Sequence, residues 1–572
     1  MTRRTSARRR SLTASIGALL CLAAIALTAG PASAVSYQRI SGAGSSWAGN
    51  AVLQWQADVK NQGVTVDYNP NGSSQGRKDF AAQVGTDFTV SEIPYRGDTA
   101  DPRDTSYPEF GFSQMPMVAG GTSFMYNLPV NGSRYTELKL SQEAAAGIFS
   151  GQILRWNDPA IAADNPGVNL PDAPITVVVR SDGSGATAQF TLWMLRQFPA
   201  AYQALCSASG ACDGAHATSY FPAANLPNFV PQSGSVGVTT YTQNTEYTIN
   251  YDEYSYAQQV GYPVAQLKNA AGFYTVPSEG AVAVALIQAR INTDQNDPNY
   301  LSQDLSAVYQ YGDPRSYALS AYSYFFVPTQ TTAGFDTAKG ATLGFFTQYS
   351  LCEGQRKMGP LGYSPLPMNL VLAALEEVRK IPGIDAETVA KLDAVKNSTL
   401  DANGGNPCNN PTFQPGDDPS HNVLVDTAPF PAGCDEACQA PWRLAGSGVA
   451  ASGPTFEAGS GEAAAPAASD PTAATGGAPA AAAPAAQGAA AGSAPVCDAD
   501  TGVCSGSVGS STGSTVAGLA VTPVSTVLPG QQGWAGPQTL MLLAAGLGAA
   551  LLLGPPLVSR LAGRRGSTSG RR

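Results

Sequence analysis

The chain has 572 residues, a formal net charge of −10, a hydrophobic fraction of 43% and nine cysteines. An acidic chain repels polyanions at long range, so we expect no nucleic acid partner. The only histidines, His216 and His421, lie in no cluster with metal-ligand spacing, so we expect no metal and no cofactor.

The first 34 residues have the pattern of a secretory signal peptide. Five arginines lie between Thr2 and Arg10, an apolar run covers residues 16–27, and Ala32-Ser33-Ala34 is a small-residue cleavage site. We therefore expect cleavage after Ala34 and an exported mature chain.

Three loops rich in glycine and serine each precede a helical pattern. They cover residues 42–47, 71–76 and 180–187, and the third follows the apolar run Val177 to Val179. The unpaired N–H groups at the start of a helix point at whatever such a loop encloses, and Arg180 would add a positive charge. Each loop alone could be an ordinary strand-to-helix connection, but three of them together predict a site for a small oxyanion.

A family resemblance links these loops to other parts of the chain. Together with residues 84–94, 151–161 and 165–171, they resemble the phosphate-binding protein of the phosphate ABC importer, a member of the periplasmic-binding-protein superfamily. The order and spacing match from about Ser41 to about Phe198, and more loosely to about residue 395. The resemblance implies a binding protein, not an enzyme, that captures inorganic phosphate and delivers it to a membrane permease.

The expected fold class is α/β, because short apolar runs alternate with helical patterns such as those at 142–149 and 366–378. The resemblance adds a two-lobe, type II periplasmic-binding-protein-like architecture with the ligand in the cleft. It places the first part of lobe I at 35–120, lobe II at 121–312 and the second part of lobe I at 313–395. The cysteines predict that a disulfide-tied extension follows at 396–445. We expect this head to be monomeric.

The resemblance also implies a set of phosphate contacts. Carried over position by position, they are Ser46, the N–H of Trp47, Ser73, Glu92, Arg180, Ser184 and the N–H groups of Gly185 and Ala186, supported by Asp182 and Thr187. Glu92 would accept a hydrogen bond from a proton on the ligand. Sulfate has no such proton, so Glu92 would select against it.

Three of these positions depart from the family pattern. Glu92 stands where the family has Asp, Ala186 where it has Thr, and Trp47 where it has Phe. The missing hydroxyl at Ala186 would cost about 0.5–1.5 kcal/mol unless Thr187 replaces it. We therefore expect a phosphate binder with altered affinity. The alternatives are a surface display or adhesion protein that has lost or changed its oxyanion binding, and a secreted phosphoester hydrolase, for which no metal cluster or activated nucleophile is evident.

The segment from Tyr251 to Tyr256 contains three tyrosines and the acidic pair Asp252 and Glu253. Its pattern favours a half-buried strand with a solvated acidic face.

Eight cysteines remain after signal removal, an even number that favours disulfides in an exported chain. Close spacing favours the pairs Cys206–Cys212, Cys434–Cys438 and Cys497–Cys504, which leaves Cys352–Cys408.

The C-terminal part has the composition of a stalk and an anchor. Residues 446–537 are rich in Ala, Gly and Pro and predict a disordered stalk, because they cannot bury enough apolar surface to fold. Residues 538–559 predict one transmembrane helix and residues 560–572 a basic cytoplasmic tail, with a buried hydrophobic helix as the alternative. The head would then stand at the cell surface, anchored in the plasma membrane.

The two arginine-rich ends hold ten of the 32 basic residues and no acidic residue. The part facing outward would therefore carry 22 basic against 42 acidic residues. Its field should repel phosphate, so binding must come from short-range hydrogen bonds inside the cleft.

Overall fold

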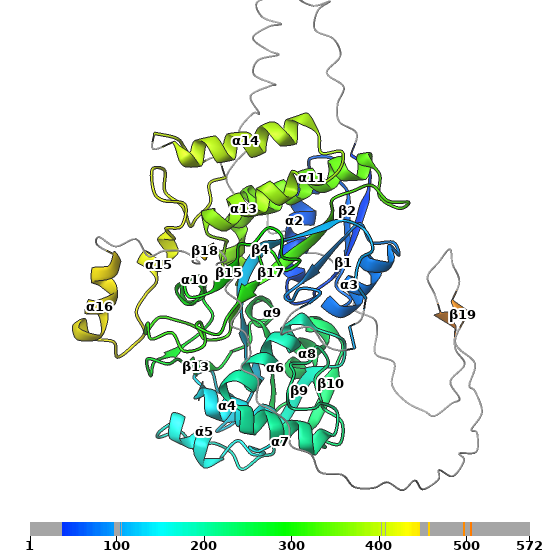
Figure 1. Ribbon diagram of the computed structural model, residues 1–572. Helices are drawn as coiled ribbons and strands as arrows, with labels where there is room; N and C mark the ends of the chain where they lie inside the picture. Colours follow the sequence, from blue (N-terminus) through cyan, green and yellow to red (C-terminus); the bar gives the residue numbers. More distant parts are fainter. Residues whose placement is uncertain are drawn as a thin grey trace, which may run out of the picture. The chain divides into compact units, whose positions relative to one another are not determined.

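The computed structural model describes residues 37–96, 103–104, 106–401, 403–406 and 408–446, together with three two-residue strands (Figure 1). Two of those strands, β19 (Val496–Cys497) and β20 (Cys504–Ser505), belong to a unit covering residues 466–572, and the other described elements belong to residues 1–465. The predicted signal peptide, transmembrane helix and basic tail, and nearly all of the stalk, lie outside the described residues. In the part of the chain that is described, no helix has both the length and the apolar character needed to cross a membrane.

The first lobe is built on a six-stranded sheet with the order β12-β4-β17-β3-β1-β2. Its strands are β1 (Ile40–Gly44), β2 (Val66–Asn69), β3 (Phe88–Ser91), β4 (Phe112–Ser123), β12 (Asp252–Glu253) and β17 (Ser320–Pro328). Strand β1 pairs in parallel with β2 and β3, whereas β17 runs antiparallel to β3 and β4. Every residue of β3 and β17 is buried, as expected for central strands covered on both faces.

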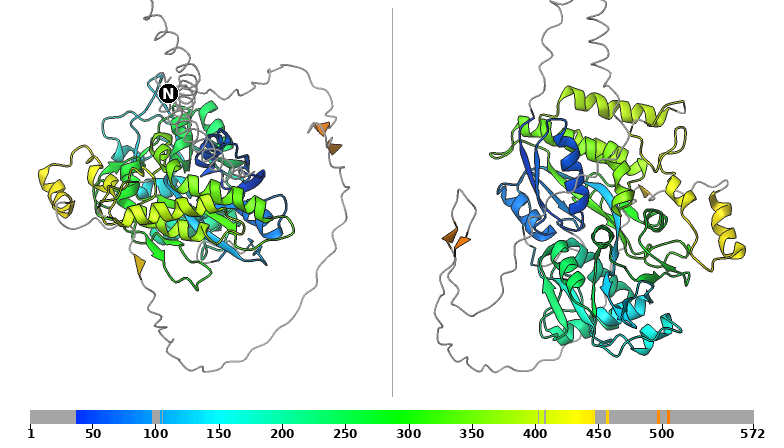
Figure 2. Two further views of the ribbon diagram at one scale, coloured as in Figure 1. Left: turned by 90° about the horizontal axis from the view of Figure 1, so that it is seen from above. Right: turned by 180° about the vertical axis from the view of Figure 1, so that it is seen from behind.

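Helices cover this large sheet. They are α2 (Gly49–Lys60), α3 (Ser73–Ala82), α10 (Glu279–Leu286), α11 (Thr337–Leu351), α13 (Met368–Val378) and α14 (Ala386–Leu400). Helix α3 packs on β1 and β3, and α13 packs on β4. Helices α11, α13 and α14, yellow-green in the ribbon, lie on the side of the sheet away from the second lobe (Figure 1 and Figure 2). Helix α10 precedes residue 312 in the chain but packs on β4 and β17 of this sheet.

The second lobe has a four-stranded sheet with the order β10-β9-β11-β5. Its strands are β5 (Tyr126–Asn127), β9 (Thr176–Arg180), β10 (Phe229–Gln232) and β11 (Thr248–Asn250), and its main helices are α4 (Gln142–Phe149), α6 (Gly185–Gln197), α7 (Pro199–Ser209) and α8 (Gly234–Asn244). Strands β10 and β11 flank β9 in parallel, and β5 closes the edge in antiparallel orientation. The predicted strand before the third loop is β9, and the predicted helix after it is α6.

Short elements connect and extend the two lobes. They are β6 (Pro129–Val130), β7 (Ser133–Arg134), β8 (Lys139–Leu140), α5 (Pro159–Asp164), α9 (Tyr254–Gln259), β13 (Gln266–Lys268), β14 (Tyr274–Thr275), β15 (Arg290–Asn292), β16 (Gln303–Asp304), the 3-10 helix Glu353–Lys357, α12 (Met358–Leu361), α15 (Val423–Thr427), α16 (Glu436–Gly446) and β18 (Phe456–Glu457).

The joint between the lobes lies at the end of β4. Only two residues separate β4 from β5 of the second lobe, and β12 pairs with the last residues of β4, with Asp252 opposite Ser123. Helix α9 follows directly and contacts both α8 of the second lobe and β4 of the first. This arrangement brings the ends of several strands and the starts of several helices to one place, which fits the two-lobe α/β expectation.

Three of the predicted disulfides are present. Cys206 pairs with Cys212, Cys352 with Cys408, and Cys434 with Cys438. The second of them fastens the C-terminal extension to the end of α11. The backbone of β19 and β20 places Cys497 opposite Cys504, but their side chains lie outside the described residues.

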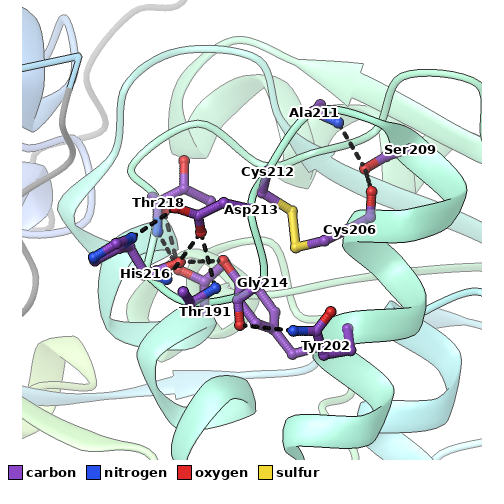
Figure 3. The surroundings of a disulfide bond; sticks show 12 residues. Thr191, Tyr202, Cys206, Ser209, Ala211, Cys212, Asp213, Gly214, His216 and Thr218 are labelled. Atoms are coloured by element: carbon purple, nitrogen blue, oxygen red, sulfur yellow. Dashed lines mark hydrogen bonds and ion pairs between the residues drawn. A yellow bond between two sulfur atoms is a disulfide. The ribbon is translucent and has the colours of Figure 1, made fainter. Parts of the chain in front are cut away.

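The Cys206–Cys212 disulfide closes the loop that follows α7 in the second lobe (Figure 3). Around it, the Tyr202 hydroxyl donates to the carbonyl of His216 at 2.7 Å, and the Thr218 N–H donates to Thr191 Oγ1 at 2.9 Å. These bonds hold the returning chain against α6 and α7, so the bridge reinforces the helix that begins at the third loop.

Candidate functional site

The three predicted loops meet at the joint between the lobes. Ser46, just before α2 in the first lobe, accepts a hydrogen bond from the N–H of Ser235 at the start of α8 at 3.0 Å. The N–H of Ser74, at the start of α3, donates to the carbonyl of Gly183 at 3.0 Å. The first turns of α2, α3, α6 and α8 therefore face one small region, where their N–H groups have no acceptor within their own helices.

A tight contact fixes the approach of two of these loops. Gly72 has a φ of +96°, and a Cβ at this position would lie 2.5 Å from Asp182 Oδ2. Only glycine adopts this conformation at no steric cost, so it lets the second loop close directly over the third.

Arg180 ends β9 and is 2% exposed. Its Nε donates to Asp182 Oδ1 at 2.8 Å, and its Nη2 pairs with Asp182 Oδ2. Burial disfavours the charged guanidinium, but the Asp182 carboxylate outweighs it and raises the pKa of Arg180, which stays protonated. Among the described residues, its Nη1 has no hydrogen-bond partner. A buried cationic donor without a partner is what a bound anion would satisfy.

Glu92, just after β3, is 1% exposed, and its carboxylate accepts hydrogen bonds from serine hydroxyls. Its Oε2 accepts from Ser73 at 2.8 Å, and its Oε1 accepts from Ser323 at 3.1 Å and also from Ser45. A Cβ at Gly185 would lie 2.4 Å from Oε2, so the first turn of α6 touches this carboxylate. Glu92 of the first lobe and α6 of the second lobe are thus in direct contact.

Other predicted site residues lie around these two groups. Ser184 caps α6 by accepting from the N–H of Thr187 at 3.3 Å, and the Thr187 hydroxyl is bonded to the hydroxyl of Tyr251 at 2.6 Å. Ala186, in the first turn of α6, is buried. Trp47 is buried too, and its Nε1 donates to Thr122 Oγ1 at 3.2 Å.

The expectation of a solvated acidic face at residues 251–256 is wrong. Asp252 is 3% exposed and Glu253 is 1% exposed, because β12 pairs with the end of β4 while α8 and α9 cover it. Burial raises the pKa of Asp252 to about 6, although the neighbouring Arg180 opposes the shift. Burial also raises the pKa of Glu253 well above its usual range.

Several polar groups at the site were not predicted from the sequence. Ser235 and Ser323 lie 189 and 231 residues away in the chain from the groups that they contact, Ser46 and Glu92. Ser323 belongs to a buried strand and Ser235 to a helix start that resembles many others. The only sequence feature that marks Ser235 is its place at the start of a helix. Several other serines share that feature, so it does not identify Ser235 as a site residue.

The arrangement suits one small tetrahedral oxyanion. It combines the buried Arg180 cation, the N–H groups of several helix starts, serine hydroxyls and the buried Glu92 carboxylate, which can accept a hydrogen bond from a protonated oxygen of the ion. In the described ranges, no group of three or more His, Cys, Asp or Glu side chains is placed to hold a metal ion.

Comparisons with known proteins show the family to which the chain belongs. A family model described as a PBP superfamily domain matches residues 29–352. The phosphate-binding protein PstS of Xylella fastidiosa (strain Temecula1) is 32% identical over 335 residues, which cover 58% of this chain and 83% of the relative. Phosphate-binding protein PstS 2 of Mycobacterium tuberculosis is 31% identical over 308 residues, which cover 53% and 76%. A solved high-affinity periplasmic phosphate-binding protein, PfluDING, aligns over 65% of this chain and 97% of its own at 20% identity, with a TM-score of 0.46.

Proposed function

This chain belongs to the PBP superfamily and to its PstS phosphate-binding proteins, and on that premise we propose that it captures inorganic phosphate between its two lobes and delivers it to an ABC importer. The observation that carries the proposal is the buried guanidinium nitrogen Nη1 of Arg180, which is unpartnered among the described residues. The guanidinium is held by Asp182 and surrounded by helix starts.

We propose that the phosphate cage consists of the residues that the resemblance names. Arg180 supplies charge, Ser46 and Ser184 supply hydroxyls, and Trp47, Gly185 and Ala186 supply N–H groups, with Asp182 and Thr187 in support. Ser73 would supply its hydroxyl by turning its proton from Glu92 to the ion. Glu92 accepts a hydrogen bond from the proton that the bound ion carries. Its three serine partners hold this longer acidic side chain in place, which supports Glu92 as a working substitute for Asp.

Capture would proceed by closure of the lobes. The bonds from Ser235 to Ser46 and from Ser74 to Gly183 join the two lobes next to the cage, and closure around phosphate would remove water from it. A permease in the membrane would then receive the ion.

We also propose that the chain is exported and held at the cell surface by residues 538–559, with residues 446–537 as a stalk. The composition of these segments supports the proposal, and a cell-surface display protein remains the competing function.

Calorimetric titration of the purified, detergent-solubilised chain with phosphate and then sulfate tests the function. We expect saturable phosphate binding that sulfate does not displace. The matched variant Glu92→Gln should bind sulfate measurably, because its side-chain amide can donate to an oxygen that carries no proton. If a folded chain gives no heat with either anion, the display function takes the place of this one.

A further inference from the structure

A buried chain of three side chains leads from Asp252 to the phosphate cage. Oδ1 of Asp252 accepts from the N–H of Glu253 at 2.7 Å and from the hydroxyl of Ser235 at 2.9 Å. The Ser235 hydroxyl in turn lies 2.9 Å from the hydroxyl of Ser46. The other oxygen of Asp252, Oδ2, is buried and has no hydrogen-bond partner within the described part of the chain.

The number of protons decides the direction of these bonds. A serine hydroxyl has one proton to give and can accept twice. While Asp252 is ionised, the Ser235 proton is used in the bond to the carboxylate. The bond between the two serines must then be donated by Ser46, so that the Ser46 proton points away from the cage.

Protonation of Asp252 reverses this order. Asp252 Oδ1 can then donate to the Ser235 hydroxyl, and Ser235 can donate to Ser46. The Ser46 oxygen accepts from both the N–H and the hydroxyl of Ser235, which fills its two acceptor positions. Its own proton becomes available to the ligand.

We propose that Asp252 controls, through the Ser235 hydroxyl, whether Ser46 donates a hydrogen bond to phosphate, so that phosphate binding is coupled to uptake of a proton by Asp252. This inference rests on the proposed function, because the cage that includes Ser46 is part of it. Asp252 and Ser235 are positioning residues that act on the ligand through Ser46.

Burial of Asp252 favours such uptake, and the neighbouring Arg180 opposes it. Arg180 approaches it from the end of β9 and Asp182 from the loop that follows. Glu253 is its neighbour in β12, and Tyr256 approaches from α9. Burial raises the pKa of Asp252 to about 6 and that of Glu253 well above its usual range.

Above pH 6, the free protein has Asp252 increasingly ionised, and binding must restore the proton. Affinity then falls as pH rises, by up to about tenfold for each pH unit above 6 relative to a chain that lacks the relay.

The test measures phosphate binding by calorimetry between pH 5.5 and 8, in pairs of buffers with different ionisation enthalpies, which gives the number of protons taken up. The purified full chain is compared with Asp252→Asn and Ser235→Ala. Because free phosphate itself titrates in this range, the readout is the difference between each variant and the wild type. The matched control is Ser113→Ala, which removes a hydroxyl bonded at 2.7 Å to the buried Glu377 at the opposite end of β4.

We expect the wild type and Ser113→Ala to take up more protons than Asp252→Asn and Ser235→Ala, and the affinity of Ser235→Ala to exceed that of the wild type increasingly above pH 6. Equal uptake in all four proteins would overturn the inference. So would full uptake in Ser235→Ala with loss in Asp252→Asn, because Asp252 would then act through space. Should folded wild type bind no phosphate at any pH, the proposed function fails and the relay fails with it. Thermal unfolding of each variant separates these results from misfolding.

Discussion

Two buried arginine–aspartate pairs of the same spacing serve different purposes in this chain. Arg180 and Asp182 lie at the joint of the lobes, whereas Asp313 and Arg315 lie under the C-terminal extension, where Arg315 Nη1 donates to the carbonyl of Val425 at 2.6 Å. All three nitrogens of the Arg315 guanidinium are thus engaged with protein, and Nη1 of Arg180 is not, among the described residues. The comparison separates a structural arginine from one prepared for a ligand.

Replacing Arg180 by Lys should weaken phosphate binding by about 10- to 100-fold. A single ammonium cannot both replace the two-point contact with Asp182 and donate to the ligand, and a hydrogen bond to a charged group is worth about 1.5–3 kcal/mol. The measurement is calorimetric titration of folded protein. The control is Arg315→Lys, which should lower stability and leave the affinity unchanged. Unchanged affinity in Arg180→Lys would remove Arg180 from the cage.

The site residues that could be predicted from the sequence are those that lie next to one another in a recognisable motif. Arg180, Asp182 and Ser184 fall within five positions, and the structure places them at the joint of the lobes. Asp252 could not be interpreted correctly, because its burial depends on pairing with Ser123 at the end of β4. A pattern of tyrosines and acids does not reveal that helices α8 and α9 cover the strand.

At the level of elements, the site is made by helix starts. Local patterns predicted α4 at its observed bounds and a helix after the third loop, which is α6, because apolar positions at helical spacing are a strong local signal. The contact between α6 and the end of β3 was not a local property. It arises because Gly185 leaves room for Glu92, which approaches from the other lobe.

Gly185→Ala should therefore abolish or strongly weaken phosphate binding. The added methyl would lie 2.4 Å from Glu92 Oε2 and 3.0 Å from the Glu92 nitrogen, so either the carboxylate or the lobes must move apart. Gly237→Ala in α8 is the matched control, because its Cβ would meet nothing closer than 3.5 Å. Alanine is favoured over glycine in a helix by up to about 1 kcal/mol, so this variant should bind normally and be no less stable. Calorimetry and thermal unfolding of both variants provide the measurements, and normal binding by Gly185→Ala would show that α6 need not touch Glu92.

At the level of the whole molecule, the charge of the head and the charge of the site oppose each other. The part expected to face outward carries 22 basic and 42 acidic residues, yet the proposed ligand is an anion. Attraction over long distances cannot account for its capture. The cage compensates with one buried cation and with N–H groups that lie too deep for salt to screen effectively.

The contrast between the acidic surface and the buried cage predicts how phosphate binding responds to salt. The equilibrium affinity should change by less than about threefold between 50 and 500 mM NaCl, because the contacts that hold the ion are buried and weakly screened. The association rate should rise with salt, since screening weakens the repulsion between the acidic surface and the approaching ion. Stopped-flow mixing gives the rate and calorimetry gives the affinity at each salt concentration. If the association rate instead fell steeply with salt, phosphate would be guided by a positive surface near the cleft, and capture would not depend on the buried groups alone.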